Sequence, residues 1–298
     1  MSGGGASDAG AAAFVCPVCP RHCHLAPGAL GRCRARRNVD GHSVPEGYGR
    51  VTSLALDPVE KKPLARFHPG SYLLSVGGYG CNLTCPFCQN HRISQAGEGD
   101  VPWRGLRPEE LAALAEEARR RNPRVIGIAH TYNEPLVAWE FVRDSALAAR
   151  ERGLVTALVS NGCACPGVID EVAPLLDAAN IDLKGFSPAF YEACGAAEDS
   201  LDVVRATIER LAAEPGCHLE VTTLVVPGMN DSETEVDAIA SWLAGLDGGR
   251  GREEIVYHVT RFFPHWRMAD TAPTPVTTVR RLADVARRRL AHVCVGNC

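Results

Sequence analysis

The stretch YLLSVGGYGCNLTCPFCQN, residues 72–90, joins an apolar run to a loop of glycines and cysteines. Residues 72–76 are apolar almost throughout, which is typical of a strand that is covered on both faces of a sheet. The glycines that follow allow the backbone to turn tightly around a bulky group. Cys81, Cys85 and Cys88 then stand within eight residues at C-x3-C-x2-C spacing. The stretch therefore predicts a buried strand whose outgoing loop carries a group of thiol ligands.

Short apolar runs of the same kind recur along the chain, and segments with helical periodicity separate them. Ser232, followed three residues later by Glu235, is a capping-box pattern that marks the start of one helix. Six strand–helix units in sequence predict a parallel sheet with right-handed crossovers. We expect strands at 72–76, 125–129, 155–159, 180–183, 219–226 and 255–259. We expect helices at 108–121, 136–152, 166–178, 201–214, 231–246 and 276–291.

The fold class is therefore α/β, and we predict a partial (β/α)6 TIM-like barrel. A complete eight-unit barrel typically takes ~250 residues, so the six strands expected here fit an open barrel better. A doubly wound sheet is the alternative. In either architecture the chemistry collects at the carboxyl ends of the strands. The three-cysteine loop lies at such an end.

The bulk composition excludes several classes of protein. The chain has 298 residues and a net charge of -4, which argues against a protein whose main task is to bind nucleic acid. No apolar run approaches the ~20 residues of a membrane helix, and the N-terminus lacks the features of a signal peptide. The thirteen cysteines cluster at short spacing, which in a reducing compartment indicates metal or redox chemistry. We therefore expect a cytoplasmic protein with neither a nucleic-acid nor a membrane partner.

The chain divides into three parts by composition. We predict a flexible leader at 1–15, a Cys-rich segment with short β pieces at 16–66, and the partial barrel at 67–298. The Cys-rich stretch itself, from Cys16 to about Arg37, is too small and polar to form a core of its own, and its four cysteines can close around one ion and so stabilise it. Zinc, a second iron–sulfur cluster and metal-free thiols are the three alternatives. The cysteines are Cys16, Cys19, Cys23 and Cys33, and His22 and His24 can substitute for them as ligands.

The three-cysteine loop is one ligand short of an ordinary metal site. A structural zinc ion takes four protein ligands, and an ordinary [4Fe–4S] cluster takes four thiolates. Three thiolates leave one iron of such a cluster open to a small molecule. The alternative is a zinc site that His91, three residues after Cys88, completes.

Polar side chains stand at the ends of several predicted strands. Glu134, after the second strand, can accept hydrogen bonds from an ammonium group. Asp182 and Lys184 close the fourth strand, and the period of two places both on the same side. Each pattern also has a structural interpretation, such as a turn or an ion pair, but recurrence at successive strand ends predicts a binding site. The residues concerned are Asn133, Glu134, Ser160, Asn161, Asp182, Lys184 and His258.

The C-x3-C-x-Φ-C pattern, with Phe87 as the aromatic residue, resembles that of the radical S-adenosylmethionine (radical SAM) enzymes. The resemblance implies that Cys81, Cys85 and Cys88 hold a [4Fe–4S] cluster whose open iron chelates S-adenosylmethionine. One electron from the cluster then releases a 5′-deoxyadenosyl radical that abstracts a hydrogen atom. No catalytic side chain is implied. The implied cofactor-binding residues are Phe87, Asn133, Glu134, Ser160, Asn161, Asp182, Lys184 and His258.

Motifs in the C-terminal part of the chain resemble one particular branch of this superfamily. His258-Val-Thr-Arg-Phe262, the Pro-Thr-Pro at 273–275 and the Val-Gly-Asn at 295–297 resemble the AmmeMemoRadiSam-system radical SAM proteins, which are relatives of the pyruvate formate-lyase activating enzymes. This branch implies hydrogen abstraction from a protein, with a small-molecule substrate as the alternative. From another class, a non-catalytic zinc-binding interaction protein stays open.

The same resemblance implies partners. A reducing protein such as flavodoxin or ferredoxin would supply the electron, and Memo-like or AMMECR-like proteins are possible protein substrates. Cys163 and Cys165 follow the Asn161-Gly162 pair and are either redox-active or bystanders. Cys194 and Cys217 have the pattern of bystanders, and no role is assigned to Cys298.

Overall fold

The computed structural model describes residues 14–298, except for the side chain at position 247. Residues 1–13 of the predicted leader lie outside this range, and its last two residues form strand β1 (Phe14–Val15). No helix of the described range is long and apolar enough to cross a membrane.

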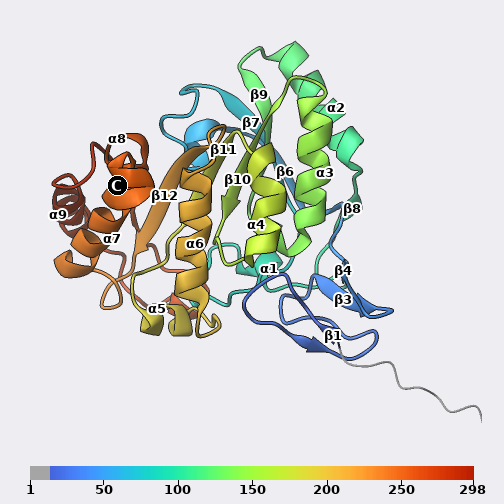
Figure 1. Cartoon of the computed structure of the whole chain (residues 1–298), viewed down its shortest axis with the longest axis horizontal. Coiled ribbons are helices and arrows are strands. Elements are labelled where there is room, and N and C mark those ends of the chain that lie inside the picture. The colour runs from blue at the N-terminus through green and yellow to red at the C-terminus, as the bar shows by residue number, and fades with distance from the viewer. Residues whose placement is uncertain (1–13) are drawn as a thin grey trace, which may run out of the picture.

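An eight-stranded sheet forms the centre of the molecule, with the strand order β14-β13-β12-β11-β10-β9-β7-β6 (Figure 1). Strand β6 is antiparallel to β7, and the other neighbours are parallel. Since β6 and β14 end the strand order, the sheet is an open barrel, and the α/β partial-barrel prediction is confirmed. The strands are β6 (Ser53–Pro58), β7 (Tyr72–Gly77), β9 (Val125–His130), β10 (Val155–Ser160), β11 (Ala178–Asp182), β12 (His218–Val225), β13 (Val256–Arg261) and β14 (His292–Gly296).

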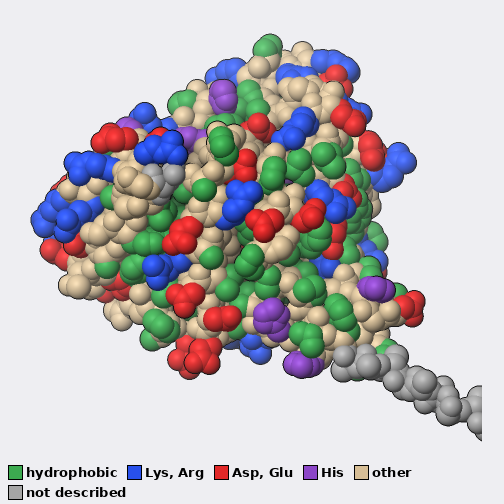
Figure 2. Space-filling view, viewed as in Figure 1, with side chains coloured by type: hydrophobic (Ala, Val, Ile, Leu, Met, Phe, Trp, Pro, Cys, Tyr) green, Lys and Arg blue, Asp and Glu red, His purple; other side chains and the backbone are tan. Residues whose placement is uncertain are grey.

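Helices cover the outer face of this sheet. Figure 1 shows α2, α3, α4 and α6 side by side over the strands, and the apolar side of α2 buries Leu111, Ala112 and Ala115. On the face seen in Figure 2, acidic and basic side chains are interspersed over these helices. The α-helices are α1 (His91–Ser94), α2 (Pro108–Arg121), α3 (Trp139–Arg150), α4 (Pro166–Val172), α5 (Pro188–Ala193), α6 (Ser200–Ala212), α7 (Glu233–Gly245), α8 (Gly251–Glu254) and α9 (Val276–Ala286). The 3-10 helices are η1 (Val59–Lys61), η2 (Pro135–Ala138), η3 (Ala173–Leu175), η4 (Leu246–Gly249) and η5 (Trp266–Met268).

All six predicted strands are present, but the sheet has two strands more. β14 was missed because its five residues are all half-buried and carry no continuous apolar signal. The helix predicted at 166–178 was too long, because α4 ends at Val172 and residues 178–182 belong to β11. Pro174 allows only a 3-10 turn between them.

The predicted capping box of α7 forms only in part. The Ser232 hydroxyl accepts a hydrogen bond from the Glu235 backbone N–H, as expected of an N-cap. The Glu235 carboxylate does not accept the reciprocal hydrogen bond from the Ser232 N–H. It accepts a 2.6 Å hydrogen bond from the Phe186 N–H and so ties α7 to the loop after β11.

Strands of the N-terminal part form three small antiparallel pairs beside the barrel, one of them with a strand from later in the chain. Strand β1 pairs with β2 (His24–Leu25), β3 (Arg36–Val39) with β4 (His42–Pro45), and β5 (Arg50–Val51) with β8 (Arg104–Gly105). Arg36 is buried and attaches this segment to the barrel. Its guanidinium donates to the Glu140 carboxylate at 2.7 Å and 2.9 Å and to the Val137 carbonyl at 3.1 Å. A buried, bidentate arginine–carboxylate pair of this kind fixes the orientation of the two parts.

The segment between β6 and β7 fills the interior of the barrel. Val59, Leu64 and Phe67 pack against small residues of the inner strands, including Ala129 and Ala157. Polar contacts also hold this segment, among them one from Asn180 Nδ2 to the Pro63 carbonyl at 2.8 Å and those of Glu220 of β12, whose side chain is fully buried.

Glu220 is a buried carboxylate with four hydrogen-bond donors. It accepts from the Ala65 and Arg66 N–H groups at 2.9 Å and 2.8 Å, from His218 Nε2 at 2.9 Å, and from His258 Nε2. Burial alone would raise the pKa of Glu220, but the hydrogen bonds from the two histidines and from Arg66 outweigh it and lower the pKa to about 2.

Replacing Glu220 by Gln is expected to lower the free energy of unfolding at pH 7 by on the order of 3 kcal/mol, because the ionised carboxylate is more stable in the folded than in the unfolded chain. The pKa of Glu220 lies below its unfolded value of 4.5. Its contribution is therefore complete above about pH 4.5 and is lost as the pH falls toward 2. Denaturant unfolding at several pH values measures the difference between variant and parent.

The control is Glu117→Gln, which removes the exposed surface pairs with Arg120 and Arg121 and should change stability by less than about 0.5 kcal/mol. A gap between Glu220→Gln and the parent that stays constant from pH 7 to pH 3 would contradict this account.

Candidate active site

A cavity of about 470 Å³ lies at the carboxyl ends of the parallel strands, a size typical of sites for small molecules. It brings together residues from the three-cysteine loop and from the ends of β9, β10 and β11. Of the predicted site residues, all but one line it, and His258 does not. The predicted residues that line the cavity are Cys81, Cys85, Phe87, Cys88, Asn133, Glu134, Ser160, Asn161, Asp182 and Lys184.

Hydrogen-bond donors face the sulfur atoms of the loop. The Cys81 sulfur accepts from the Leu83 N–H at 3.4 Å and from Asn161 Nδ2 at 3.7 Å. The Cys88 sulfur lies 3.4 Å from the Ser94 hydroxyl. Burial, followed by the nearby Glu134 carboxylate, raises the pKa of Cys81 well above its usual value. A thiolate there needs a bound cation, which the irons of a cluster supply, and the N–H donors suit cluster sulfurs.

Cys194 stands beside this loop, although the sequence pattern gave it no role. It is fully buried at the end of α5, and its carbonyl accepts a 2.8 Å hydrogen bond from the Thr84 N–H. A hydrogen bond from the Cys194 thiol lowers the pKa of Cys85. Nothing in the spacing of Cys194 from the loop could have indicated this contact.

His91 does not join the three thiols. Its ring stacks on Trp266 with a centroid distance of 5.5 Å and an angle of 5° between the planes, and its Nδ1 lies 3.2 Å from the Cys88 carbonyl. Within residues 14–298, no three Cys, His, Asp or Glu side chains are grouped to hold a single metal ion. The structure thus gives the zinc alternative at His91 no support.

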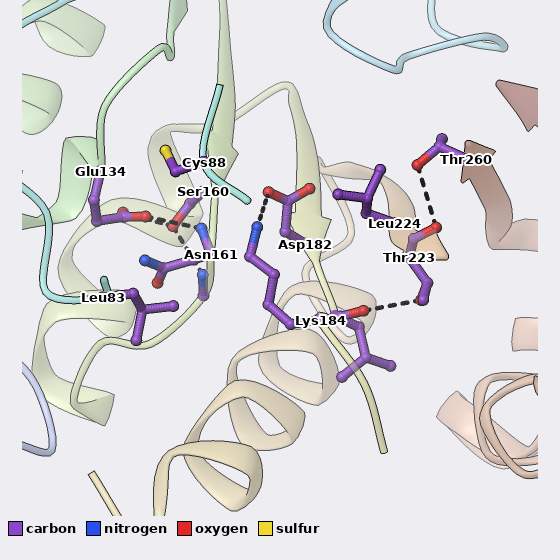
Figure 3. Close-up of polar contacts among 12 residues, drawn as sticks. Leu83, Cys88, Glu134, Ser160, Asn161, Asp182, Lys184, Thr223, Leu224 and Thr260 are labelled. Carbon is purple, nitrogen blue, oxygen red and sulfur yellow. Dashed lines mark hydrogen bonds and ion pairs between the residues drawn. The ribbon is translucent and has the colours of Figure 1, made fainter. Parts of the chain in front are cut away.

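Glu134 is a cavity carboxylate that lies beside Ser160 and Asn161 (Figure 3). Its oxygens accept hydrogen bonds from the Ser160 hydroxyl at 2.7 Å, the Asn161 N–H at 2.8 Å and the Leu136 N–H at 3.0 Å. The side chain is 2% exposed, and burial raises its pKa, which a nearby cation would counter. A carboxylate with this surrounding can accept from an ammonium group of a ligand.

Asn133 and Asn161 hold the loop in place. Asn133 Nδ2 donates to the Tyr79 and Gly80 carbonyls at 3.0 Å and 3.1 Å, and its oxygen accepts from the Gly78 N–H at 3.0 Å. Asn161 Nδ2 donates to Asn82 Oδ1 at 2.9 Å. The Asn133 amide, predicted to contact a cofactor, is therefore engaged by the backbone of the glycine loop.

Asp182 and Lys184 form the ion pair that the period of two led us to expect, with 2.7 Å between Nζ and Oδ2 (Figure 3). Burial would lower the pKa of Lys184, but Asp182 and then Cys85 outweigh it, and the pKa is raised. Lys184 is thus a permanent positive charge beside the three-cysteine loop.

The remaining predicted residues differ in their placement. Phe87 is buried and packs on Phe190 with a centroid distance of 6.0 Å. His258 contacts Glu220 in the interior of the barrel. It lies two residues before the cavity residue Thr260 on the same strand, β13, and therefore farther from the carboxyl end of the strand. Sequence reasoning also missed several lining residues, because they lie on other strand ends or in the segment after β6. These are Lys61, Lys62, Thr131, Tyr132, Thr222, Leu224, Thr260, Arg261, Phe263, His265 and Asn297.

The Cys-rich segment touches the three-cysteine loop directly. Arg21 Nε donates to the Asn82 carbonyl at 3.2 Å. The segment also contacts the loop between β10 and α4, where the Cys165 N–H donates to the Val18 carbonyl at 2.9 Å. Gly80 has φ +86, and a Cβ built there would stand 2.4 Å from the Cys33 carbonyl oxygen. Only glycine allows this approach.

Residues 75–238, more than half of the chain, match the radical SAM superfamily. The chain therefore belongs to the radical SAM superfamily, whose members bind a [4Fe–4S] cluster and S-adenosylmethionine. An uncharacterized protein of Methanocaldococcus jannaschii is 37% identical over 287 residues, which are 95% of this chain and 80% of that protein.

Two solved structures share the fold. A radical SAM methyltransferase from Sphaerobacter thermophilus superimposes with a TM-score of 0.57 at 18% identity, over 77% of this chain and 67% of that one. SuiB of Streptococcus suis bound to S-adenosylmethionine gives a TM-score of 0.52 at 11% identity, over 74% of this chain and 48% of that one.

Replacing Gly80 by Ala is expected to cost more stability than the roughly 1–2 kcal/mol of a left-handed backbone alone, because the new Cβ must push the Cys33 carbonyl away. The displaced loop should also take up less iron on reconstitution. Denaturant unfolding and iron analysis measure both effects.

Gly70→Ala is the matched control, since Gly70 has φ +81 and nothing within 4 Å of its added Cβ. Equal losses of stability in the two variants, with normal iron uptake, would show that the contact with Cys33 does not position the loop.

Proposed function

We propose that this radical SAM protein uses a [4Fe–4S] cluster on Cys81, Cys85 and Cys88 to abstract a hydrogen atom from a polypeptide substrate. The observation that carries the proposal is that one cavity is lined by these three thiols, by Glu134 and by the Asp182–Lys184 pair. When bound, the cluster and S-adenosylmethionine supply a 5′-deoxyadenosyl radical, and the protein contributes binding, orientation and exclusion of water.

The polar residues of the cavity divide this work. Glu134, oriented by Ser160 and the Asn161 N–H, accepts from the amino group of the cofactor. The Asp182–Lys184 pair offers one charge of each sign to the remaining polar groups of the cofactor. Phe87 and Leu83 line the same space with apolar surface and keep water from the reacting groups.

An open mouth supports a polypeptide substrate. Strands β6 and β14 end the strand order of the sheet, and the cavity lining includes exposed side chains such as Phe263, at 42%, and Lys61.

We propose that the chain belongs to the AmmeMemoRadiSam branch, related to pyruvate formate-lyase activating enzymes, and that it acts in the cytoplasm. Flavodoxin or ferredoxin is the proposed reductant, and Memo-like or AMMECR-like proteins are the proposed substrates. The partners proposed include no nucleic acid and no membrane.

We propose the four N-terminal cysteines as a second metal site, of zinc or of another iron–sulfur cluster, with free thiols as the third alternative, although their described side chains, like those of the three-cysteine loop, are not grouped around one ion in the structure. Cys16 and Cys33 are buried, and Cys19 and Cys23 are half-buried. Burial raises the pKa of Cys19 to about 12. The Cys19 thiol therefore carries no charge at neutral pH unless a metal ion is bound.

Anaerobically reconstituted protein is expected to contain a [4Fe–4S] cluster and, once reduced, to convert S-adenosylmethionine into 5′-deoxyadenosine. Replacing Cys81, Cys85 and Cys88 together by Ala removes all thiolate ligands of the cluster, so 5′-deoxyadenosine formation should fall by more than about 100-fold. Electron paramagnetic resonance and mass spectrometry of the nucleoside measure the two properties.

Cys16→Ala is the control and should keep both. Its metal content also separates the alternatives at the N-terminal site, because zinc is lost in one case, iron and sulfide in the second, and neither in the third. Retention of cluster and turnover by the triple variant would overturn the proposed function.

The substrate can be identified by incubating the enzyme with candidate partner proteins that are perdeuterated. With unlabelled S-adenosylmethionine, a substrate protein is expected to transfer one deuterium to 5′-deoxyadenosine, which mass spectrometry detects as a one-unit shift. Deuterium transfer only from a perdeuterated fraction of small molecules would replace the polypeptide by a small-molecule substrate.

A further inference from the structure

The charges in the cavity are unevenly distributed. Both lining carboxylates, Glu134 and Asp182, belong to the residues that face the cofactor and the three-cysteine loop. The other described lining residues contain no carboxylate, but they include the cations Lys61, Lys62 and Arg261. The part of the cavity that remains for a substrate is therefore positive.

A single carboxylate compensates the two lysines. Asp57 of β6 accepts from Lys62 Nζ at 2.8 Å and from the Tyr132 hydroxyl at 2.6 Å. Lys61 Nζ lies 3.8 Å from the other oxygen of Asp57 and is 68% exposed. This group of side chains keeps one positive charge in excess, on the exposed Lys61.

Arg261 is held as a preorganised cation at the end of β13. Its Nε donates to the Thr274 carbonyl at 2.7 Å, and its guanidinium carbon lies 4.7 Å from the centre of the Phe263 ring. Thr274 is fully buried and is itself fixed, because its hydroxyl donates to the Val225 carbonyl at 2.6 Å. The side chain therefore has little freedom left to lose when it binds a ligand.

The two terminal amino groups of Arg261 have no partner in the part of the chain that the structure describes. Its hydrogen bond to Thr274 uses only Nε, and among the described side chains no carboxylate lies within ion-pair distance of its guanidinium. An arginine with its Nε engaged and its face on an aromatic ring presents a planar fork of donors. That fork matches the two oxygens of a carboxylate or a phosphate.

We propose that the substrate of this site carries a carboxylate or phosphate group, which the two terminal amino groups of Arg261 bind, with Lys61 as the second positive charge. This inference rests on the proposed function and specifies the class of its substrate. In a polypeptide, the group is an acidic side chain, a phosphorylated residue or the terminal carboxylate close to the hydrogen that is removed.

Inorganic phosphate and acetate are the probes, titrated separately into oxidised holoprotein that is saturated with S-adenosylmethionine. The oxidised cluster does not consume S-adenosylmethionine. The carboxylate site of this cofactor is therefore already filled, and the probes cannot bind there. Line broadening of the ³¹P or ¹³C signal reports binding. The parent should bind at least one probe, and Arg261→Gln should weaken binding about tenfold because a charge-assisted pair is lost. Arg261→Lys should fall between them.

Arg267→Gln is the matched control, because Arg267 is an arginine of the same segment that stacks on Trp266 and does not line the cavity. It should bind the probes as the parent does. Unchanged cluster absorbance and unfolding midpoint verify that Arg261→Gln is folded, and Arg261→Lys repeats the test if it is not. Binding of phosphate alone indicates a phosphorylated substrate, and binding of acetate alone indicates a carboxylate.

Three results would overturn the inference. They are no binding of either probe to the parent, equal binding to Arg261→Gln, and binding that appears only when S-adenosylmethionine is left out, which would give Arg261 to the cofactor. The proposed function fails separately, if the reduced parent does not form 5′-deoxyadenosine.

Discussion

A buried carboxylate joins the parts of this site. Glu134 stands after β9, and its hydrogen bonds with Ser160 and Asn161 connect it to the end of β10. Asn161 continues the connection to Asn82 and to the sulfur of Cys81. The ends of two strands and the three-cysteine loop therefore form one buried network, in which each polar group depends on its partners. Under the proposed function, the amino group of the cofactor would be a further partner of Glu134 in this network.

Much of the fold could be predicted because the strands are buried on both faces. Such a strand appears in the sequence as a continuous apolar run, as at residues 155–159, whereas the half-buried β14 gives no such run. Within the site, the spacing of the cysteines and the period of two at Asp182 and Lys184 are local properties, so the sequence contains them.

Long-range contacts could not be predicted in this way. The orientation of Arg261 depends on a carbonyl thirteen residues later, and the surroundings of Cys85 depend on Cys194, which α5 brings to it. The Glu235 carboxylate also took a partner on another element instead of the local cap. Each of these contacts forms only after the chain has folded, because it joins groups on different elements.

The open sheet has a mechanical consequence. In a closed barrel, widening the mouth would break backbone hydrogen bonds between neighbouring strands. Here β6 and β14 stand at opposite ends of the described strand order and share no ladder, while residues near each of them line the cavity. Widening the mouth between these two edges would therefore break no strand pair of the described sheet.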